Sequence, residues 1–156
     1  MRFTLIDRIV ELQSGKKITA VKNLSMAEEY LADHFPGFPV LPGVLMLEAM
    51  TQAAAWLVRA SEDFKHSVVV LKEARNVKYN KFVEPGQTLT VVAELIGQTE
   101  EEARFKAHGE VEGEQAVSAR LTLATYNLAD TDAGRALTDQ VVRHKLRELF
   151  ALLDRA

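Results

Sequence analysis

Residues 34–58 read HFPGFPVLPGVLMLEAMTQAAAWLV, and this stretch decides the fold. Its first ten residues include three prolines and two glycines. Each proline fixes its own φ and keeps the preceding residue extended, so a stiff, non-helical loop is predicted. From Val44 to Val58 neither proline nor glycine occurs, and most residues are Leu, Met, Ala or Val. We therefore predict a helix over about residues 43–60 that begins just after Pro42, a usual place for proline at a helix start.

The predicted helix has only three polar residues between positions 44 and 58, namely Glu48, Thr51 and Gln52. A helix that is apolar on nearly every side is typical of a buried helix. The three polar residues are spaced i, i+3 and i+4, so they form one narrow stripe. Because a carboxylate is costly to bury unless it has a partner or a raised pKa, Glu48 is a candidate functional residue.

His34 opens the proline-rich loop, fourteen residues before Glu48. A histidine and a carboxylic acid of tuned pKa are a common pair for moving two protons near neutral pH. The helix start at Gly43 adds free N–H groups and a positive dipole end, which can hold a carbonyl oxygen as negative charge develops on it. The stretch therefore predicts a base, an acid and an oxyanion site.

A family resemblance rests on these residues and their spacing. His34-Phe-Pro-Gly-x-Pro-x-x-Pro-Gly-Val, followed by Glu48-Ala-Met-x-Gln52, resembles the signature of the (3R)-hydroxyacyl-[acyl-carrier-protein] dehydratases of bacterial fatty-acid synthesis. Glu on the helix favours the broad-specificity, FabZ-like branch, because the sister FabA-like branch, which also isomerises the double bond, carries Asp there. Further matching positions at 5–8, 22–25 and 82–86 extend the resemblance over about residues 5–124.

The resemblance and the residue chemistry together predict the reaction. Water leaves a 3-hydroxyacyl thioester to give the trans-2-enoyl thioester. His34 is expected to take the α-proton, and Glu48, kept protonated by apolar surroundings, to donate to the departing hydroxyl. The Gly43 amide is expected to hold the thioester oxygen. By resemblance, the Val40 backbone orients His34, while Gln52 is expected either to orient Glu48 or the substrate or to serve a structural role.

The resemblance also implies partners. The substrate is expected on acyl carrier protein, an acidic protein, for which we consider a basic surface containing Lys72, Arg75, Lys78 and Lys81. Members build the site between two subunits, with the histidine from one and the acid from the other, so a homodimer is expected and a trimer of dimers is plausible. Val69 and Val70 stand where members often carry tyrosines, one of which can gate the acyl tunnel.

The rest of the chain up to residue 126 alternates in the manner of antiparallel strands. Two strands are predicted within residues 3–12 and 17–24, and four more within 67–83, 88–97, 105–111 and 116–126. Ser25 and Glu28 have the spacing of a capping box, which predicts a short helix over 26–32. A buried helix with about six antiparallel strands indicates an α+β fold, and the resemblance implies the hotdog fold, a sheet wrapped around a central helix.

Residues 1–126 are predicted to form the hotdog dehydratase domain, and residues 127–156 a C-terminal linker and amphipathic helix. Apolar residues recur at helical spacing over 134–154. The favoured interpretation is a helix packed on its own protomer or across a subunit interface. The alternative is a lid or a docking surface for the carrier protein. Arg143, Lys145 and Arg147 are expected to form a solvated face.

Composition excludes several classes of function. The 156 residues carry a net charge of −3, which argues against nucleic-acid binding. None of them is cysteine, which excludes zinc–thiolate sites and fits a reducing compartment. No signal peptide and no run long enough to span a membrane is seen, so a cytoplasmic protein without membrane contact is expected. No metal-ligand spacing or phosphate loop occurs, and neither a metal nor another cofactor is predicted.

Three other functions compete with the dehydratase. A hotdog thioesterase would use the helix carboxylate to direct water, but it leaves the His34 loop unexplained. A two-domain CoA-dependent hydratase usually has Asp and His close together in one motif, and this chain has no such pair. A non-catalytic acyl-binding subunit does not require both His34 and Glu48.

Overall fold

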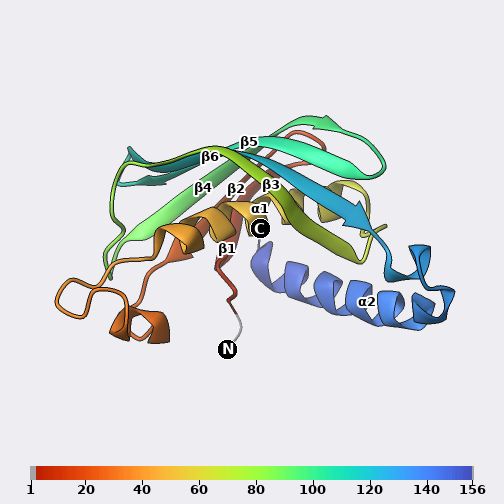
Figure 1. Ribbon diagram of the computed structural model, residues 1–156, viewed down its shortest axis with the longest axis horizontal. Helices are drawn as coiled ribbons and strands as arrows, with labels where there is room; N and C mark the ends of the chain where they lie inside the picture. The colour runs from red at the N-terminus through yellow and green to blue at the C-terminus, as the bar shows by residue number, and fades with distance from the viewer. Residues whose placement is uncertain (1–2, 156) are drawn as a thin grey trace.

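The computed structural model describes residues 3–155. Six strands and two α-helices make up most of the chain (Figure 1). The strands are β1 (Arg8–Gln13), β2 (Lys17–Asn23), β3 (Val68–Tyr79), β4 (Thr88–Gln98), β5 (Glu102–Val111) and β6 (Glu114–Tyr126). The helices are α1 (Gly43–Ser61) and α2 (Ala136–Leu153), with short 3-10 turns at Glu29–Ala32, Leu128–Asp130 and Ala133–Arg135.

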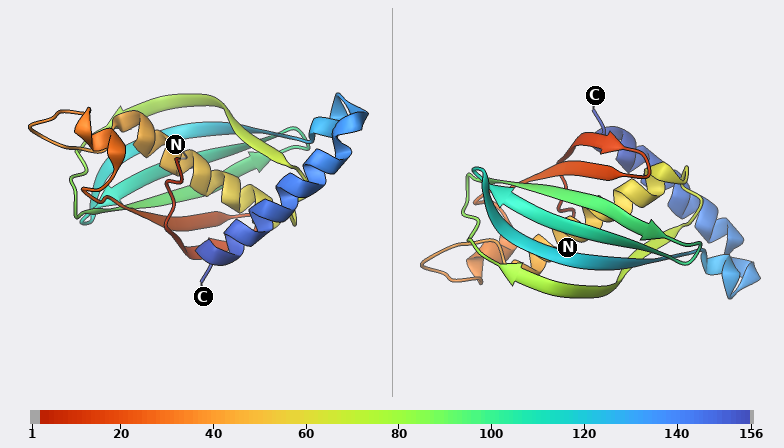
Figure 2. Two further views of the ribbon diagram at one scale, coloured as in Figure 1. Left: turned by 90° about the horizontal axis from the view of Figure 1, so that it is seen from below. Right: turned by 90° about the horizontal axis from the view of Figure 1, so that it is seen from above.

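The strands form one antiparallel sheet in the order β1-β2-β4-β5-β6-β3. The sheet arches over α1, which lies across its concave face (Figures 1 and 2). This arrangement confirms the hotdog fold. The order leaves β1 and β3 at the two edges, and β3 is a twelve-residue strand with one paired side within this chain. An edge strand of that length is a surface to which another strand can add.

The buried face of α1 is made largely of small side chains, which allows the helix to lie close to the sheet. Its fully buried members include Ala49, Met50, Ala53, Ala54 and Leu57. The opposite face is more open than the sequence suggested. Val44 is 68% exposed, and Glu48 and Gln52 are half-buried. The expectation of a helix buried on nearly every side is therefore wrong for this face of the single chain.

The N-terminal region differs from its prediction in two ways. The first strand begins at Arg8, because Phe3 and Leu5 are held on α1, where their backbone groups hydrogen-bond Gln52. Asp7 already bonds β2, with its amide donating to the Val21 carbonyl at 2.8 Å. The predicted capping box is also absent. Glu28 forms an ion pair with the buried Lys22 at 2.6 Å, and only a single 3-10 turn follows.

The predicted C-terminal helix is α2, and it packs on its own chain beside the second half of α1 (Figure 2). Phe150 contacts Trp56 and Phe64, with ring centroids 5.9 and 5.6 Å apart. The expected solvated face is partly wrong, because two of its arginines bind the chain. Arg143 donates to Asn127, and Arg147 donates to the side chain and carbonyl of Asp63 while stacking over Phe64.

Candidate active site

The loop before α1 holds His34 through backbone contacts. The His34 amide donates to the Tyr30 carbonyl at 3.2 Å, and the Leu41 amide donates to the Val83 carbonyl at 2.9 Å. Phe35 has a φ of 58°, a left-handed conformation that is uncommon for an aromatic residue. Such strained residues persist only where the surrounding structure enforces them, and they cluster at functional sites. The prolines correctly predicted a non-helical loop, but they did not predict the left-handed backbone conformation at Phe35.

The His34 ring is half-buried, and its Nδ1 lies 3.1 Å from the carbonyl oxygen of Val40. A carbonyl oxygen can only accept a hydrogen bond, so Nδ1 must carry the proton. In the neutral ring the other nitrogen, Nε2, is then unprotonated and able to act as a base. Val40 is itself fully buried, which fixes the position of its carbonyl group.

His34 and Gly43 line one cavity of about 340 Å³, together with Met46, Tyr79 and Phe82. Gly43 is the first residue of α1, so its N–H belongs to the helix end that has no partner within the helix. A Cβ at Gly43 would lie 3.0 Å from the Tyr79 ring, so the ring packs directly against the glycine backbone. The cavity therefore combines a candidate base, the N-terminal end of α1 with its N–H groups that have no partner within the helix, and an aromatic side chain in its wall.

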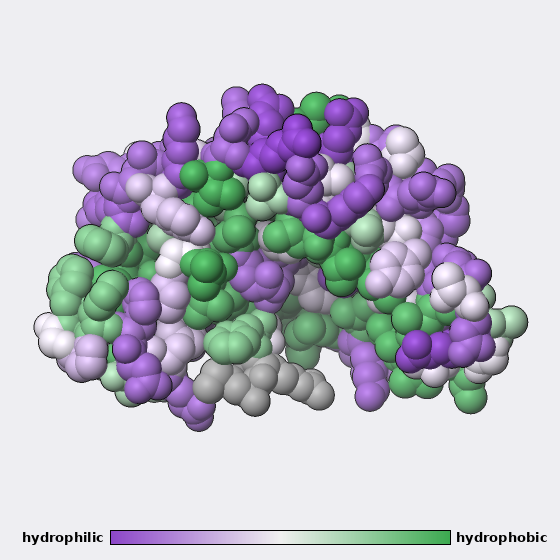
Figure 3. Space-filling model, in the orientation of Figure 1, coloured by the Kyte–Doolittle hydropathy of each residue, from purple (hydrophilic) through white to green (hydrophobic). Residues whose placement is uncertain are grey.

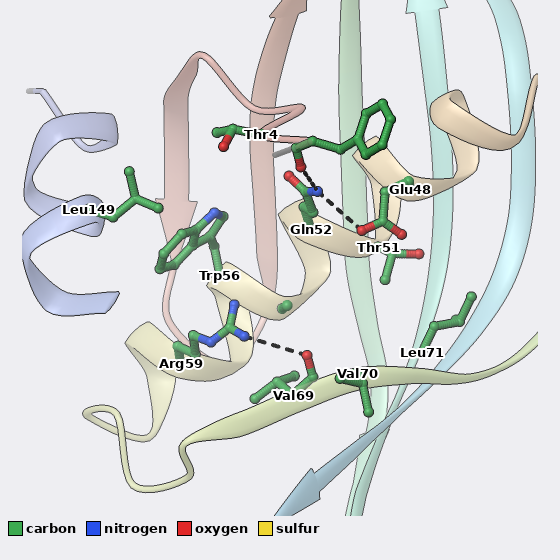
Figure 4. Close-up of a pocket in the computed structure, with 12 residues that line it drawn as sticks. Thr4, Glu48, Thr51, Gln52, Trp56, Arg59, Val69, Val70, Leu71 and Leu149 are labelled. Atoms are coloured by element: carbon green, nitrogen blue, oxygen red, sulfur yellow. Dashed lines mark hydrogen bonds between the residues drawn. The ribbon is translucent and has the colours of Figure 1, made fainter. Parts of the chain in front are cut away.

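Glu48 lies one turn further along α1, and Gln52 holds it. The Gln52 Nε2 donates to Glu48 Oε1 at 3.1 Å and to the Phe3 carbonyl at 2.7 Å (Figure 4). Its Oε1 accepts from the Leu5 amide at 2.9 Å. Every polar atom of the Gln52 side chain is thus used, and the residue links Glu48 to the N-terminal segment. Thr51 instead donates to the Leu47 carbonyl within α1.

A second cavity, of about 400 Å³, begins at Glu48 and runs along α1 (Figure 4). Its lining comes from α1, from the start of β3 and from α2. Among the lining residues are Glu48, Gln52, Trp56, Arg59, Val69, Val70, Leu71 and Leu149. Apolar side chains also gather across the centre of the face seen in Figure 3, below a hydrophilic rim. A mostly apolar cavity with few polar groups is typical of a ligand site.

Within one chain, the predicted site residues fall into two groups. His34, Val40 and Gly43 are brought together, and Glu48 and Gln52 are brought together, but the two groups line different cavities. Three further residues line these cavities and were not predicted from the sequence: Tyr79 in the His34 cavity, and Trp56 and Arg59 in the Glu48 cavity. Trp56 and Arg59 follow Glu48 by eight and eleven residues, and helical spacing alone places them on its side of α1.

Three of the four basic candidates on and after β3 are already paired with carboxylates. Lys72 contacts Glu102 and Arg75 contacts Glu73, and Lys81 lies 3.2 Å from Glu114. Such exposed pairs are weak and exchange readily. Lys81 also lines the cavity that contains His34.

Residues 3–155 contain no group of three His, Asp or Glu side chains placed to hold a metal ion. Over the same range, neither α1 nor α2 is long and apolar enough to cross a membrane.

Comparison with protein families gives one match over most of the chain. The model of the FabA-like domain matches residues 1–120. A 3-hydroxyacyl-[acyl-carrier-protein] dehydratase FabZ from Caldicellulosiruptor saccharolyticus is 38% identical, with 78% of this chain and 87% of that protein covered. The protein of the same name from Rickettsia bellii is 40% identical over 77% of this chain and 83% of its own length.

Solved structures agree on the fold. A chain of the dehydratase heterocomplex ApeI:P from Xenorhabdus doucetiae superposes with a TM-score of 0.68 at 20% identity, covering 81% of this chain and 85% of its own. A mutant thioesterase PA1618 from Pseudomonas aeruginosa superposes with a TM-score of 0.59 at 16% identity, covering 76% and 80%. At these identities the likeness concerns the fold alone, which different activities share.

Proposed function

The chain belongs to the FabA-like family, and we propose that it is a 3-hydroxyacyl-[acyl-carrier-protein] dehydratase of fatty-acid biosynthesis. The reaction removes water from a (3R)-3-hydroxyacyl thioester and leaves the trans-2-enoyl thioester. The observation that carries this proposal is the His34–Val40 contact, which leaves the Nε2 of His34 free to take a proton beside an unpaired helix end.

In the proposed mechanism, His34 removes the α-proton and the electron pair moves toward the thioester carbonyl. The Gly43 N–H donates to that carbonyl oxygen as it becomes negative, an interaction typically worth ~10²–10³ in rate. The pair then forms the Cα–Cβ double bond as the hydroxyl leaves. The Glu48 carboxyl donates the proton that turns the departing hydroxyl into water, and Gln52 positions that carboxyl.

We propose that His34 of one subunit works with the partner subunit's Glu48. Two features of the single chain support a homodimer. The edge of β3 is unpaired within the chain, and exposed apolar side chains surround the start of α1. Among the latter, Val44 is 68% exposed, and Phe38 and Phe82 stack edge-on while 45% and 57% exposed. Large apolar side chains left exposed in this way support a protein interface at this end of the molecule. Assembly into a trimer of dimers and a cytoplasmic location stay predictions.

The carrier protein is proposed to dock beside Lys81, because this residue lines the His34 cavity and its ion pair with Glu114 is partly exposed to solvent. We further propose that residues 1–126 form the catalytic domain and that residues 127–156 are an addition packed onto it. The family match ends at residue 120, six residues before the end of β6, which supports this division.

The test is the conversion of (3R)-3-hydroxybutyryl carrier protein by the purified full chain, followed by mass spectrometry of the carrier. The proposal expects the enoyl thioester. Release of free acid and unacylated carrier would indicate the thioesterase, and no conversion would indicate an acyl-binding subunit. His34→Ala and Glu48→Gln should each abolish dehydration while the circular dichroism and melting temperature remain close to wild type. Retention of most activity in either variant would remove that residue from the mechanism.

A further inference from the structure

The guanidinium group of Arg59 gives the cavity beside Glu48 a positively charged end. The polar and aromatic residues of α1 that line this cavity are Glu48, Thr51, Gln52, Trp56 and Arg59. Arg59 lies eleven residues beyond Glu48, which is about 16 Å along the helix axis. In Figure 4 its guanidinium group points from α1 toward β3, and Trp56 and Leu149 lie on the same side of the cavity.

Arg59 has few partners for its five N–H donors. Its Nε is buried and has no hydrogen-bond partner among residues 3–155. Its Nη2 lies 3.5 Å from the Val69 carbonyl oxygen, at the long limit of a hydrogen bond. The adjacent carboxylate of Glu62 is engaged with the His66 ring at 3.0 Å. Burial lowers the pKa of Arg59 to about 10, against the opposing effect of Glu62.

Apolar and aromatic side chains line the end of the cavity that holds Arg59, while Glu62 is the nearby carboxylate that opposes the burial effect on its pKa. The guanidinium lies 5.1 Å from the centre of the Trp56 ring, and Val69, Val70 and Leu149 complete this end of the cavity. Because Leu149 comes from α2, the C-terminal helix contributes to the lining of this cavity beside the half-buried Arg59. A buried donor without an acceptor is costly, and a low-dielectric setting strengthens any acceptor that reaches it.

We propose that Arg59 binds an oxygen acceptor at the far end of the acyl chain, so that the enzyme prefers 3-hydroxyacyl chains ending in a carboxylate over chains ending in a methyl group. This inference rests on the proposed function, since it assigns the cavity beside Glu48 to the acyl chain. A terminal carboxylate makes charge-assisted hydrogen bonds to a guanidinium, and these are stronger than neutral ones. A methyl terminus in the same place would cover the guanidinium without offering an acceptor.

The distance sets the length of the chain that reaches Arg59. Side chains on a helix lean toward its N-terminus, so the guanidinium lies closer to Glu48 than the backbone separation suggests. With carbon–carbon bonds of about 1.5 Å, an extended chain of roughly 8 to 12 carbon atoms spans the gap. A four-carbon chain is too short to reach it.

The experiment compares carrier-bound 3-hydroxyacyl substrates of one length, about ten carbons, that end in a methyl, a hydroxyl or a carboxylate. In the wild-type protein, kcat/KM should rise from methyl to hydroxyl to carboxylate, and the carboxylate should exceed the methyl by roughly tenfold to a hundredfold. In Arg59→Met the ratio of carboxylate to methyl should fall to one or below. Arg120→Met, on the exposed outer face of β6, is the matched control and should keep the wild-type ratio.

Equal kcat/KM for the three termini in the wild-type protein would overturn the inference, and this comparison needs no variant to fold. A carboxylate preference that survives in Arg59→Met would overturn it as well. The four-carbon substrate separates this failure from a failure of the proposed function. If (3R)-3-hydroxybutyryl carrier protein is dehydrated but the termini are not distinguished, only the role of Arg59 is lost.

Discussion

The indole ring of Trp56 and the phenyl ring of Phe150 lie with centroids 5.9 Å apart, and this contact joins α2 to the helix that carries Glu48. Trp56 is the only tryptophan in the chain, so its fluorescence reports on whether α2 is docked. The same contact places Leu149 in the wall of the cavity beside Glu48. The C-terminal helix is therefore linked physically to the candidate site, although it lies beyond the matched family region.

The first prediction concerns Asp139, which anchors the start of α2. It is 1% exposed and accepts hydrogen bonds from the Ser67 hydroxyl and the Leu128 and Ala129 amides. Asp139→Ala should lower the melting temperature by several degrees and shift Trp56 emission to longer wavelength, because α2 loses its anchor. Asp154→Ala, at the exposed end of α2, is the control. An unchanged Trp56 spectrum in Asp139→Ala would show that this anchor is dispensable.

The second prediction concerns acid. Burial raises the pKa of the Asp139 carboxyl, but hydrogen bonds from Ser67, Ala129 and Leu128 and the charge of Arg143 outweigh it, so the net pKa lies below the ordinary value. A carboxyl whose pKa is lower in the folded state than in the unfolded state stabilises the fold. This stabilisation is fully present above the pKa of the unfolded state, about 3.9, and is lost as the pH falls through the pKa of the folded state. Trp56 emission should therefore be constant near neutral pH and change only below about pH 4. A transition centred near neutral pH would contradict this.

The third prediction concerns Gln52 as a positioning residue. Gln52→Leu leaves the Leu5 amide without its acceptor and removes the donor to Glu48, which should reduce stability by about 1–3 kcal/mol. It should also lower kcat while KM changes little, since the carboxyl of Glu48 loses its orientation. Gln13→Leu on the exposed edge strand is the control and should change neither quantity. A stability loss with an unchanged kcat would leave Gln52 a purely structural role.

The fourth prediction concerns the close approach of Gly43 and Tyr79. In Gly43→Ala the new methyl group would meet the Tyr79 ring at 3.0–3.3 Å, and the half-exposed ring can shift to relieve the contact. The chain should fold, but kcat/KM should fall because the methyl group and the displaced ring narrow the His34 cavity. Gly43→Ala combined with Tyr79→Ala should recover part of the loss, with a coupling of about 0.5–3 kcal/mol. Additive losses would argue against a steric cause.

The fifth prediction tests the shared site. His34→Ala and Glu48→Gln homodimers should each be inactive. If the site takes its base and acid from different subunits, a mixed dimer has one intact site. In an equimolar mixture that exchanges subunits at random, about half of the dimers are mixed, and each mixed dimer has one of its two sites intact. The mixture should therefore recover about one quarter of wild-type activity. Activity measured before and after subunit exchange checks this. No recovery in verified mixed dimers would place both residues in one subunit.

Several features were accessible from the sequence because they depend on neighbours along the chain. The prolines at 36, 39 and 42 predicted the stiff loop, the absence of proline and glycine predicted α1, and alternation predicted most strands. Boundaries that depend on distant partners were predicted less well. Phe3 and Leu5 fit the alternation of a strand, yet Gln52, forty-seven residues after Leu5, holds their backbone on α1. The capping box at Ser25 failed because Lys22 takes Glu28 as its ion-pair partner.

The candidate site divides in the same way. Residue type and short-range spacing predicted the loop and the first turns of α1 and singled out His34, Gly43 and Glu48 as candidate site residues, while alternation along the chain indicated the α+β class. Only the tertiary structure decided that His34 and Glu48 line separate cavities of one chain, and that the Nε of the half-buried Arg59 is buried without a hydrogen-bond partner among residues 3–155. The physical reason is that burial and pairing depend on which strands and helices meet in space. No local pattern in α1 encodes the positions of Val69 on β3 and Leu149 on α2.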